Sequence, residues 1–175
     1  GMYVPEEGSI AVKGETYSSL TPKQAIGLGI GMVHQEFMLV REMTVLENII
    51  LGFEPRRGGR IDRRAALEKI EYYADTYGLR VHPDKKVEEI SVGEAQRVEI
   101  IKTLYRGAEI LVLDEPTAVL TPQEVEQLFC ILRSMKEGGK SIVFISHKLQ
   151  EVLAISDRIT VMRGGKHIAT VAGSS

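Results

Sequence analysis

The sequence lacks the features that mark secreted, membrane-spanning or nucleic-acid-binding proteins. Cys130 is its single cysteine, which excludes an internal disulfide framework. The longest apolar runs, at 110–113 and 142–145, are far too short to cross a bilayer, and no charged-then-apolar signal peptide opens the chain. The formal net charge is −2, so neither a basic field nor an acidic tail is present. We therefore expect a cytosolic protein with no nucleic-acid partner.

The apolar and charged residues that are present suit one globular domain. The 175 residues are 43% hydrophobic and 26% charged, enough for a real core. The runs at 110–113 and 142–145 are typical of strands buried on both faces, and residues 159–162 are expected to form a third strand. Helical patterns separate these strands. The alternation predicts an α/β fold with a parallel sheet and helices on its faces.

Helix starts are marked by a hydroxyl residue followed three positions later by Gln or Glu, the pattern of a capping box. A helix is also predicted over 63–77, with Gly78 as its stop. We expect a short strand between Gly8 and Gly14, a strand at 30–34, a loop at 54–60 and a mostly helical insert over about 42–87. A turn at 163–166 is expected to lead into a last strand. The predicted capping residues are Thr21, Thr44, Ser91 and Thr121.

Two adjacent carboxylates, Asp114 and Glu115, follow the apolar run at 110–113. Open α/β sheets bind their ligands at the C-terminal ends of the strands. Asp114 could hold Mg²⁺ directly or through water, and Glu115 could face a water that attacks a phosphate. A strand followed by an ordinary polar turn is the alternative. A phosphatase-like arrangement is excluded, because Pro116 stands where a second aspartate is needed.

A helix start at Ser91 is the second candidate. Its free backbone N–H groups and partial positive charge suit a phosphate, and Gly93 would let a ligand approach the backbone. Ser91 and Glu94 also have the spacing of a capping box, which needs no function.

His147 and Gln35 each follow a predicted strand. His147, after the run at 142–145, would point to the same sheet edge as Glu115. A structural histidine and a solvated glutamine are the alternatives for these two positions.

Taken together in chain order, these residues resemble the ATP-binding subunit of ABC-type importers of sugars or nucleosides, in its first nucleotide-binding domain. The stretches SVGE-x-QRVEIIK-x-L and LDEPTAVLTPQE are similar to that family in detail. The matching positions are Gln35, Ser91, Gly93, Glu94, Asp114, Glu115 and His147.

The resemblance implies a P-loop NTPase-like fold, with an α/β core over about 1–41 and 107–175 and a helical subdomain over about 42–106. It implies ATP and Mg²⁺ as ligands, with Glu115 and His147 as catalytic residues and Asp114 and Gln35 on the metal. Residues 90–94 would be the signature motif, in which Ser91, Gly93 and Glu94 contact nucleotide. Val92 and Glu94 depart from the broad family's Gly and Gln. In the loop at 118–121, Thr121 replaces the usual Asp.

The same resemblance implies two protein partners and a location. A membrane permease would contact about residues 36–52, and a second nucleotide-binding domain of the same polypeptide would complete the site. The protein would then be cytoplasmic and peripheral on the inner face of the cell membrane.

A P-loop (Gly, four residues, then Gly-Lys-Ser or Gly-Lys-Thr) is missing from the 175 residues. Gly139-Lys140-Ser141 does not complete a P-loop, because Ser134 stands where the first glycine of the pattern belongs. By resemblance, the chain starts after the P-loop and lacks the first core strand, which would lie between 142–145 and 159–162. We therefore expect a fragment that binds ATP only weakly and does not hydrolyse it alone. It would close the gap left by the missing strand by shifting the two neighbouring strands together or by self-association.

A non-catalytic regulatory or interaction module is the alternative function. An ATPase of DNA repair or translation is a third, weaker alternative.

Overall fold

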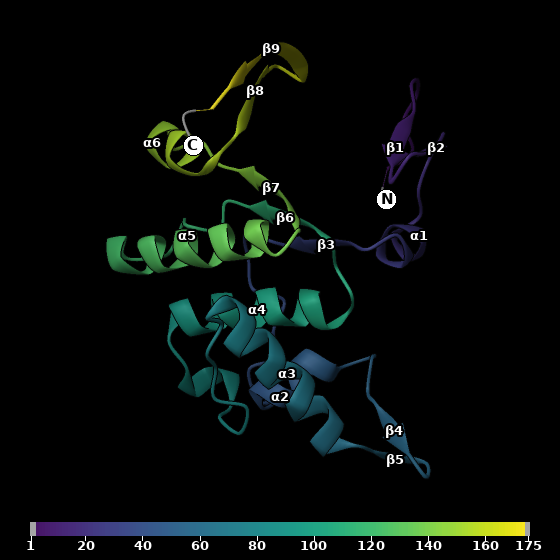
Figure 1. Cartoon of the computed structure of the whole chain (residues 1–175), viewed down its shortest axis with the longest axis vertical. Helices are drawn as coiled ribbons and strands as arrows, with labels where there is room; N and C mark the ends of the chain where they lie inside the picture. Colours follow the sequence, from purple (N-terminus) through teal and green to yellow (C-terminus); the bar gives the residue numbers. More distant parts are fainter. Residues whose placement is uncertain (1–2, 174–175) are drawn as a thin grey trace.

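A three-stranded parallel sheet forms the centre of the computed structural model, which describes residues 3–173 (Figure 1). Strand β6 (Ile110–Asp114) lies between β3 (Ile30–Val33) and β7 (Ser141–Ile145). Leu113 of β6 pairs with Val33 on one side and Phe144 on the other. All three strands therefore end at the same edge, and the predicted α/β class with a parallel sheet is confirmed.

Helices α4 (Val92–Tyr105) and α5 (Pro122–Glu137) contact β3 and β7, respectively. Leu111 and Leu113 of β6 are fully buried. The prediction that the strand at 142–145 is buried on both faces is wrong, because Val143 and Ile145 are 48% and 44% exposed. Alternate strand residues point to opposite faces, and the described helices cover only one face of β7.

Helices α2 (Val45–Ile50) and α3 (Arg63–Tyr77) pack against each other and against α4, farther from the sheet than α4 (Figure 1). Leu46, Ile49 and Ile70 fill the space between them and are almost completely buried. A short 3₁₀ helix, Val87–Glu89, leads into α4. These helices lie within the predicted insert at 42–106, whose separation as a subdomain stays a prediction.

Three antiparallel hairpins lie outside the parallel sheet. They are β1 (Ile10–Val12) with β2 (Glu15–Tyr17), β4 (Arg56–Arg57) with β5 (Arg60–Ile61), and β8 (Arg158–Arg163) with β9 (Lys166–Ala172). The predicted short strand between Gly8 and Gly14 is confirmed as β1, and the strand at 159–162 with its turn into a last strand is confirmed as β8 and β9. The parallel pairing expected of residues 159–162 is wrong, because β8 pairs antiparallel with β9. The loop at 54–60 is wrong where β4 and β5 form.

The physical cause is the same in each hairpin. Each turn has two consecutive residues with positive φ, the last pair being Gly164 and Gly165 at 57° and 74°. Two such residues form the tight turn whose twist matches antiparallel strands. In the part of the chain that the structure describes, β8 pairs only with β9, so the strands at 142–145 and 159–162 have not shifted together.

The helices begin where the hydroxyl residues predict. Thr21, Thr44 and Thr121 each form a complete capping box, at the starts of α1 (Pro22–Gly27), α2 and α5. The box predicted at Ser91 is wrong in its second half, because Ser91 Oγ accepts from the Glu94 N–H but the Glu94 carboxylate turns elsewhere. The last helix, α6, spans Leu149–Ile155.

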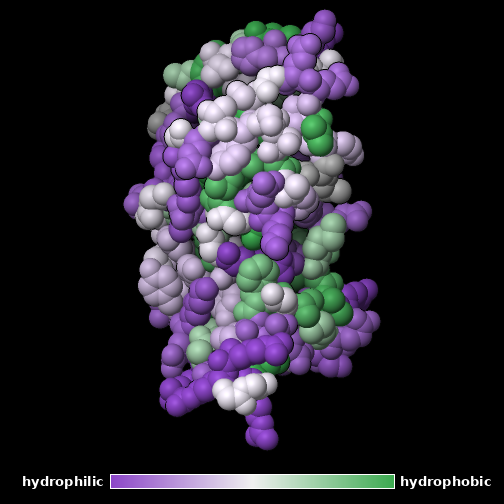
Figure 2. Space-filling view, turned by 90° about the vertical axis from the view of Figure 1, so that its right-hand side faces the viewer, coloured by the Kyte–Doolittle hydropathy of each residue, from purple (hydrophilic) through white to green (hydrophobic). Residues whose placement is uncertain are grey.

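The surface is mixed in polarity. On the side that carries β1, β2 and α1, apolar patches interrupt the hydrophilic surface (Figure 2). Among residues 3–173, no helix combines the length and apolar character needed to span a membrane.

Candidate functional site

Glu115 and His147 meet at the C-terminal edge of the sheet. Glu115 follows the last residue of β6, and His147 lies two residues after the end of β7. The His147 Nδ1 atom is 2.7 Å from Glu115 Oε1. The His147 side chain is 77% exposed and that of Glu115 only 17%. The structure thus confirms that both residues lie at one sheet edge, while their catalytic roles stay predictions.

The backbone of Glu115 is strained. Its φ of 47° lies in the left-handed region, which L residues other than Gly, Asn and Asp seldom adopt. A hydrogen bond of 3.0 Å from its N–H to the Ile145 carbonyl joins it to the end of β7. Conformations of this kind cluster at functional sites, where the surroundings hold them in place. The sequence carries no signal for this strain.

One carboxylate oxygen of Glu115 lacks a hydrogen-bond partner among the described residues. Glu115 Oε2 is buried and has no hydrogen-bond partner among the described residues. A buried oxygen of this kind usually has a protein or water partner. The orphan atom therefore marks a place where a further donor, such as a water, would complete the site.

A partly buried polar cluster connects the loops that carry Glu115 and His147. Thr117 is fully buried and donates its hydroxyl to Glu151 Oε2 at 2.6 Å. Lys148 Nζ pairs with Glu151 at 3.1 Å and donates to the Thr117 carbonyl at 3.2 Å. These contacts tie the chain after β6 to the start of α6. The sequence analysis missed them, because a Thr, a Lys and a Glu at these spacings match no recognised pattern.

Asp114 and Gln35 lie at the ends of neighbouring strands, since Val33 pairs beside Leu113. The described residues contain no cluster of three or more His, Cys, Asp or Glu side chains. Mg²⁺ commonly takes one or two protein oxygens and completes its shell with water and substrate phosphates. Asp114 and Gln35 are oxygen donors of the right kind and number for that arrangement. Their metal-binding role stays a prediction.

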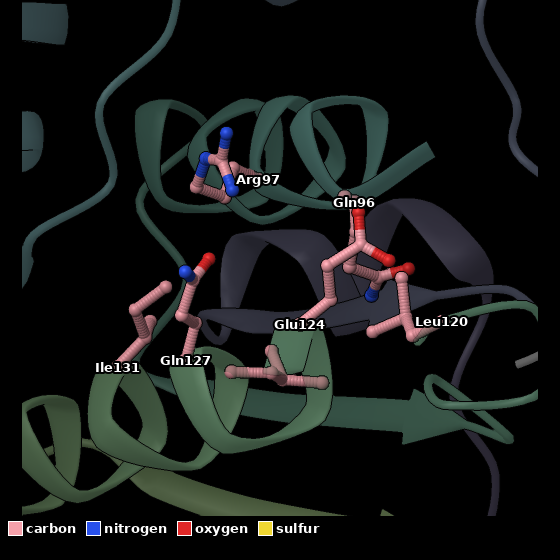
Figure 3. Close-up of a pocket in the computed structure, with 8 residues that line it drawn as sticks. Gln96, Arg97, Leu120, Glu124, Gln127 and Ile131 are labelled. Atoms are coloured by element: carbon pink, nitrogen blue, oxygen red, sulfur yellow. The ribbon is translucent and has the colours of Figure 1, made fainter. Parts of the chain in front are cut away.

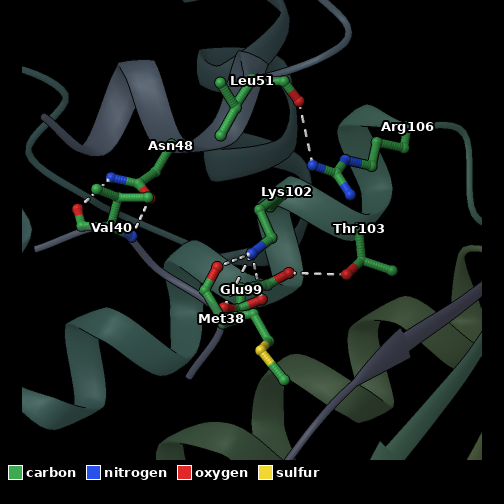
Figure 4. A network of polar contacts seen from close by, with 8 residues as sticks. All are labelled: Met38, Val40, Asn48, Leu51, Glu99, Lys102, Thr103 and Arg106. Carbon is green, nitrogen blue, oxygen red and sulfur yellow. Dashed lines mark hydrogen bonds and ion pairs between the residues drawn. The ribbon is translucent and has the colours of Figure 1, made fainter. Parts of the chain in front are cut away.

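The segment after Gln35 is fixed to the helices by a polar network (Figure 4). Lys102 Nζ of α4 donates to the Met38 carbonyl at 2.7 Å and pairs with Glu99 at 2.9 Å. Burial lowers the pKa of Lys102, and the neighbouring Glu99 carboxylate partly opposes this change. Asn48 of α2 accepts from the Val40 N–H at 2.7 Å and donates to the Val40 carbonyl at 3.0 Å.

The start of α4 contacts other parts of the chain. Glu94 Oε1 accepts from the His82 backbone N–H and also pairs with His82 Nδ1, both at 2.8 Å. Gly93 lies against the Glu124 side chain at the start of α5. Gly93 thus lies against α5, Glu94 binds His82 and Ser91 caps its own helix, whereas Glu115 and His147 contact each other. Nucleotide binding by these three residues stays a prediction.

The fold is that of solved ATP-binding cassettes. The chain matches a nucleotide-free ATP-binding cassette from an ABC transporter with a TM-score of 0.83 and 26% identity, over 99% of this chain and 73% of that one. It matches the ADP conformation of another ATP-binding cassette of an ABC transporter with a TM-score of 0.80 and 27% identity, over 96% and 70% of the two chains. The predicted P-loop NTPase-like class is therefore confirmed.

The chain belongs to the ABC transporter family, whose sequence profile matches residues 1–118. It is 54% identical to the nucleoside import ATP-binding protein NupA of Lactococcus lactis subsp. cremoris and 55% identical to the guanosine import ATP-binding protein NupO of Bacillus subtilis. Each comparison extends over 171 residues, which is 98% of this chain and 34% of the relative. The ribose import ATP-binding protein RbsA 3 of Rubrobacter xylanophilus is 44% identical over 95% of this chain and 34% of its own length.

The chain thus spans about a third of the length of these relatives. The predicted resemblance to ATP-binding subunits of sugar and nucleoside importers is confirmed at the level of the family.

Proposed function

We propose that this chain is part of an ATPase that powers an ABC importer and that Glu115 and His147 carry the hydrolysis. The observation behind this proposal is the 2.7 Å contact between their side chains at the C-terminal edge of a parallel sheet. Relatives named as nucleoside or guanosine importers reach 54–55% identity, against 44% for a ribose importer. We therefore favour a nucleoside as the solute, with a sugar as the alternative.

The proposed reaction is the attack of water on the γ-phosphorus of ATP, which forms inorganic phosphate and releases ADP. Glu115 would orient the water and accept its proton, since Oε2 is buried without a partner in the described chain. His147, largely exposed beyond Glu115, would donate to the γ-phosphate. Mg²⁺, held by Asp114 and Gln35, would supply positive charge to the phosphate oxygens.

We also propose that the 175 residues alone bind ATP weakly and do not hydrolyse it. They contain no P-loop, whose amides, lysine and hydroxyl hold the β- and γ-phosphates. Each lost charge-assisted hydrogen bond contributes about 1.5–3 kcal/mol, so losing several would weaken binding by roughly three orders of magnitude. A calorimetric titration that gave micromolar affinity for ATP would contradict this part of the proposal.

The proposed partners are a membrane permease, through about residues 36–52, and a second nucleotide-binding domain in the same polypeptide. The segment suits a docking role because Lys102 and Asn48 hold its backbone while Met38 and Leu51 are 61% and 44% exposed. Such a complex would place the protein on the cytoplasmic face of the membrane. Self-association of the 175 residues remains part of the proposal, since Val143 and Ile145 of β7 are exposed.

The deciding experiment measures ATP hydrolysis by the whole protein that carries this chain, with Glu115→Gln and His147→Ala as variants. We expect each to lower kcat by about 100-fold or more, the size of a lost general base or phosphate contact. Glu137→Gln, an exposed change at the end of α5, is the matched control and should keep the original rate. Near-normal hydrolysis by Glu115→Gln would refute the proposal. A whole protein that binds but never hydrolyses ATP would favour the alternative, a non-catalytic regulatory module.

A further inference from the structure

The N-terminal turn of α4 faces the first turn of α5, and a carboxylate fills the space between them. A Cβ atom added to Gly93 would lie 2.4 Å from Glu124 Oε1 and 2.9 Å from Glu124 Cδ. Only a residue without a side chain lets the carboxylate come so close to the backbone of α4. Ser91 Oγ caps the Glu94 N–H, whereas the other N–H groups of this first turn have no partner within the helix. Together with the partial positive charge of the helix start, they make it a place that favours an anion.

The groups around Glu124 favour its charged carboxylate form. Its pKa is lowered chiefly by the Thr121 backbone N–H, with further contributions from the Thr121 hydroxyl, the Gly93 N–H and the charge of Arg97. Glu124 thus serves two helices at once, as the partner of Thr121 in α5 and as a negative charge at the start of α4.

A second observation points to a ligand at this place. Gln96 is 97% buried by its neighbours (3% exposed), and its Nε2 has no partner in the described part of the chain. Gln96, Gly93 and Glu124 line a small cavity of about 10 Å³, room for roughly one water. Figure 3 shows the Gln96 and Glu124 side chains directed toward each other between the two helices. The site therefore has an unused donor beside an anion.

The other two complete capping boxes lack this second contact. In α2, Glu47 accepts from Thr44 in the same way, and in α1 the neutral Gln24 does so with Thr21. A capping box in this chain therefore needs neither a negative charge nor a neighbouring helix. Helix capping therefore does not explain why the Glu124 carboxylate also lies against Gly93.

We propose that Glu124 is an internal occupant of the α4 N-terminus, which an incoming phosphate group must displace before it can bind there. This inference rests on the proposed function, in which the amides after Ser91 contact a phosphate. It adds a self-blocking contact: the start of α4 stays closed to anions until the Glu124 side chain turns away. Glu124 would then set how tightly that turn binds an oxyanion, without taking part in the hydrolysis.

The test is a titration of the 175-residue chain with inorganic phosphate, followed by NMR of the Gly93 and Glu94 backbone amides. The variants are Glu124→Gln, Glu124→Ala and, as the matched control, Glu47→Gln. Gln24 shows that glutamine completes a capping box, so Glu124→Gln should keep its fold, and Glu124→Ala removes the occupant altogether. We expect both changes at 124 to tighten phosphate binding by about tenfold or more, the effect of removing one competing charge-assisted contact. Glu47→Gln should bind as the original chain does.

Equal phosphate affinity in the original chain and in both variants at 124 would overturn the inference, and so would an equal gain from Glu47→Gln, which would indicate a general charge effect. Absence of amide shifts in all forms would also overturn it. None of these outcomes depends on Glu115 or His147, whose part in hydrolysis is tested separately in the whole protein.

Discussion

Replacing Lys102 with Met should markedly lower the urea concentration at which half of the chains are unfolded. Lys102 and Glu99 form a buried ion pair in α4, with side chains 10% and 4% exposed. Removing the lysine leaves the Glu99 carboxylate buried without its counter-charge and also removes a donor to the Met38 carbonyl. Breaking a buried pair from one side typically costs about 3–5 kcal/mol. That is a large fraction of the roughly 5–15 kcal/mol that stabilises an ordinary domain.

The assay is equilibrium urea unfolding of Lys102→Met beside the double variant Glu99→Leu/Lys102→Met. The double variant replaces both charges with apolar groups, which is often neutral or stabilising, so it should recover most of the loss. For a chain of this size, the same loss of stability corresponds to a fall in Tm of roughly 6–20 °C. A single variant within about 1 kcal/mol of the original chain would refute the reasoning, because that is the range of an exposed ion pair.

Three further changes test other parts of the structure. Gly31→Ala should destabilise the chain by about 1–3 kcal/mol, because the new Cβ would lie 2.2 Å from Thr103 Cγ2; adding Thr103→Ser, which removes that methyl group, should recover part of the loss in the same urea assay. The pKa of Glu47 is lowered mainly by the Thr44 backbone N–H, so its stabilising effect is present above its ordinary pKa and lost as the pH falls through the folded-state value. Acid unfolding of Glu47→Gln should therefore be less steep below about pH 4. Val143→Lys, on the exposed face of β7, should reduce any self-association seen by light scattering; association unchanged by this variant would place the contact elsewhere.

The parallel sheet could be predicted because its strands are local, continuous apolar runs. Residues 110–113 and 142–145 are too apolar to lie in loops, and the helical patterns between them require a crossover, which makes neighbouring strands parallel. That arrangement alone brings Glu115 and His147 to one edge. Helix starts were equally predictable, since a hydroxyl N-cap acts within four residues of the chain.

Features that depend on distant partners were not predictable. The Glu94 carboxylate has the spacing of a capping box, yet it binds His82, which offers both a backbone N–H and a ring nitrogen. The strand at 159–162 and the turn at 164–165 into a last strand are predictable, because two consecutive glycines allow the positive φ values that a tight turn needs. The antiparallel pairing of β8 with β9 is not, because apolar residues carry the same local pattern in a parallel strand.

Glu115 shows how stability and function oppose each other in this fold. Its left-handed backbone costs about 1–3 kcal/mol in a residue that is not glycine, and its buried Oε2 lacks a partner among the described residues. A glycine at 115 would relieve both costs, so a chain selected for stability alone would have no use for a glutamate there. Both costs make sense under the proposed function, in which one oxygen lies against His147 and the buried Oε2 accepts from a bound water. The strain at 115 and the contact to His147 therefore both support the proposed catalytic role of this edge of the sheet.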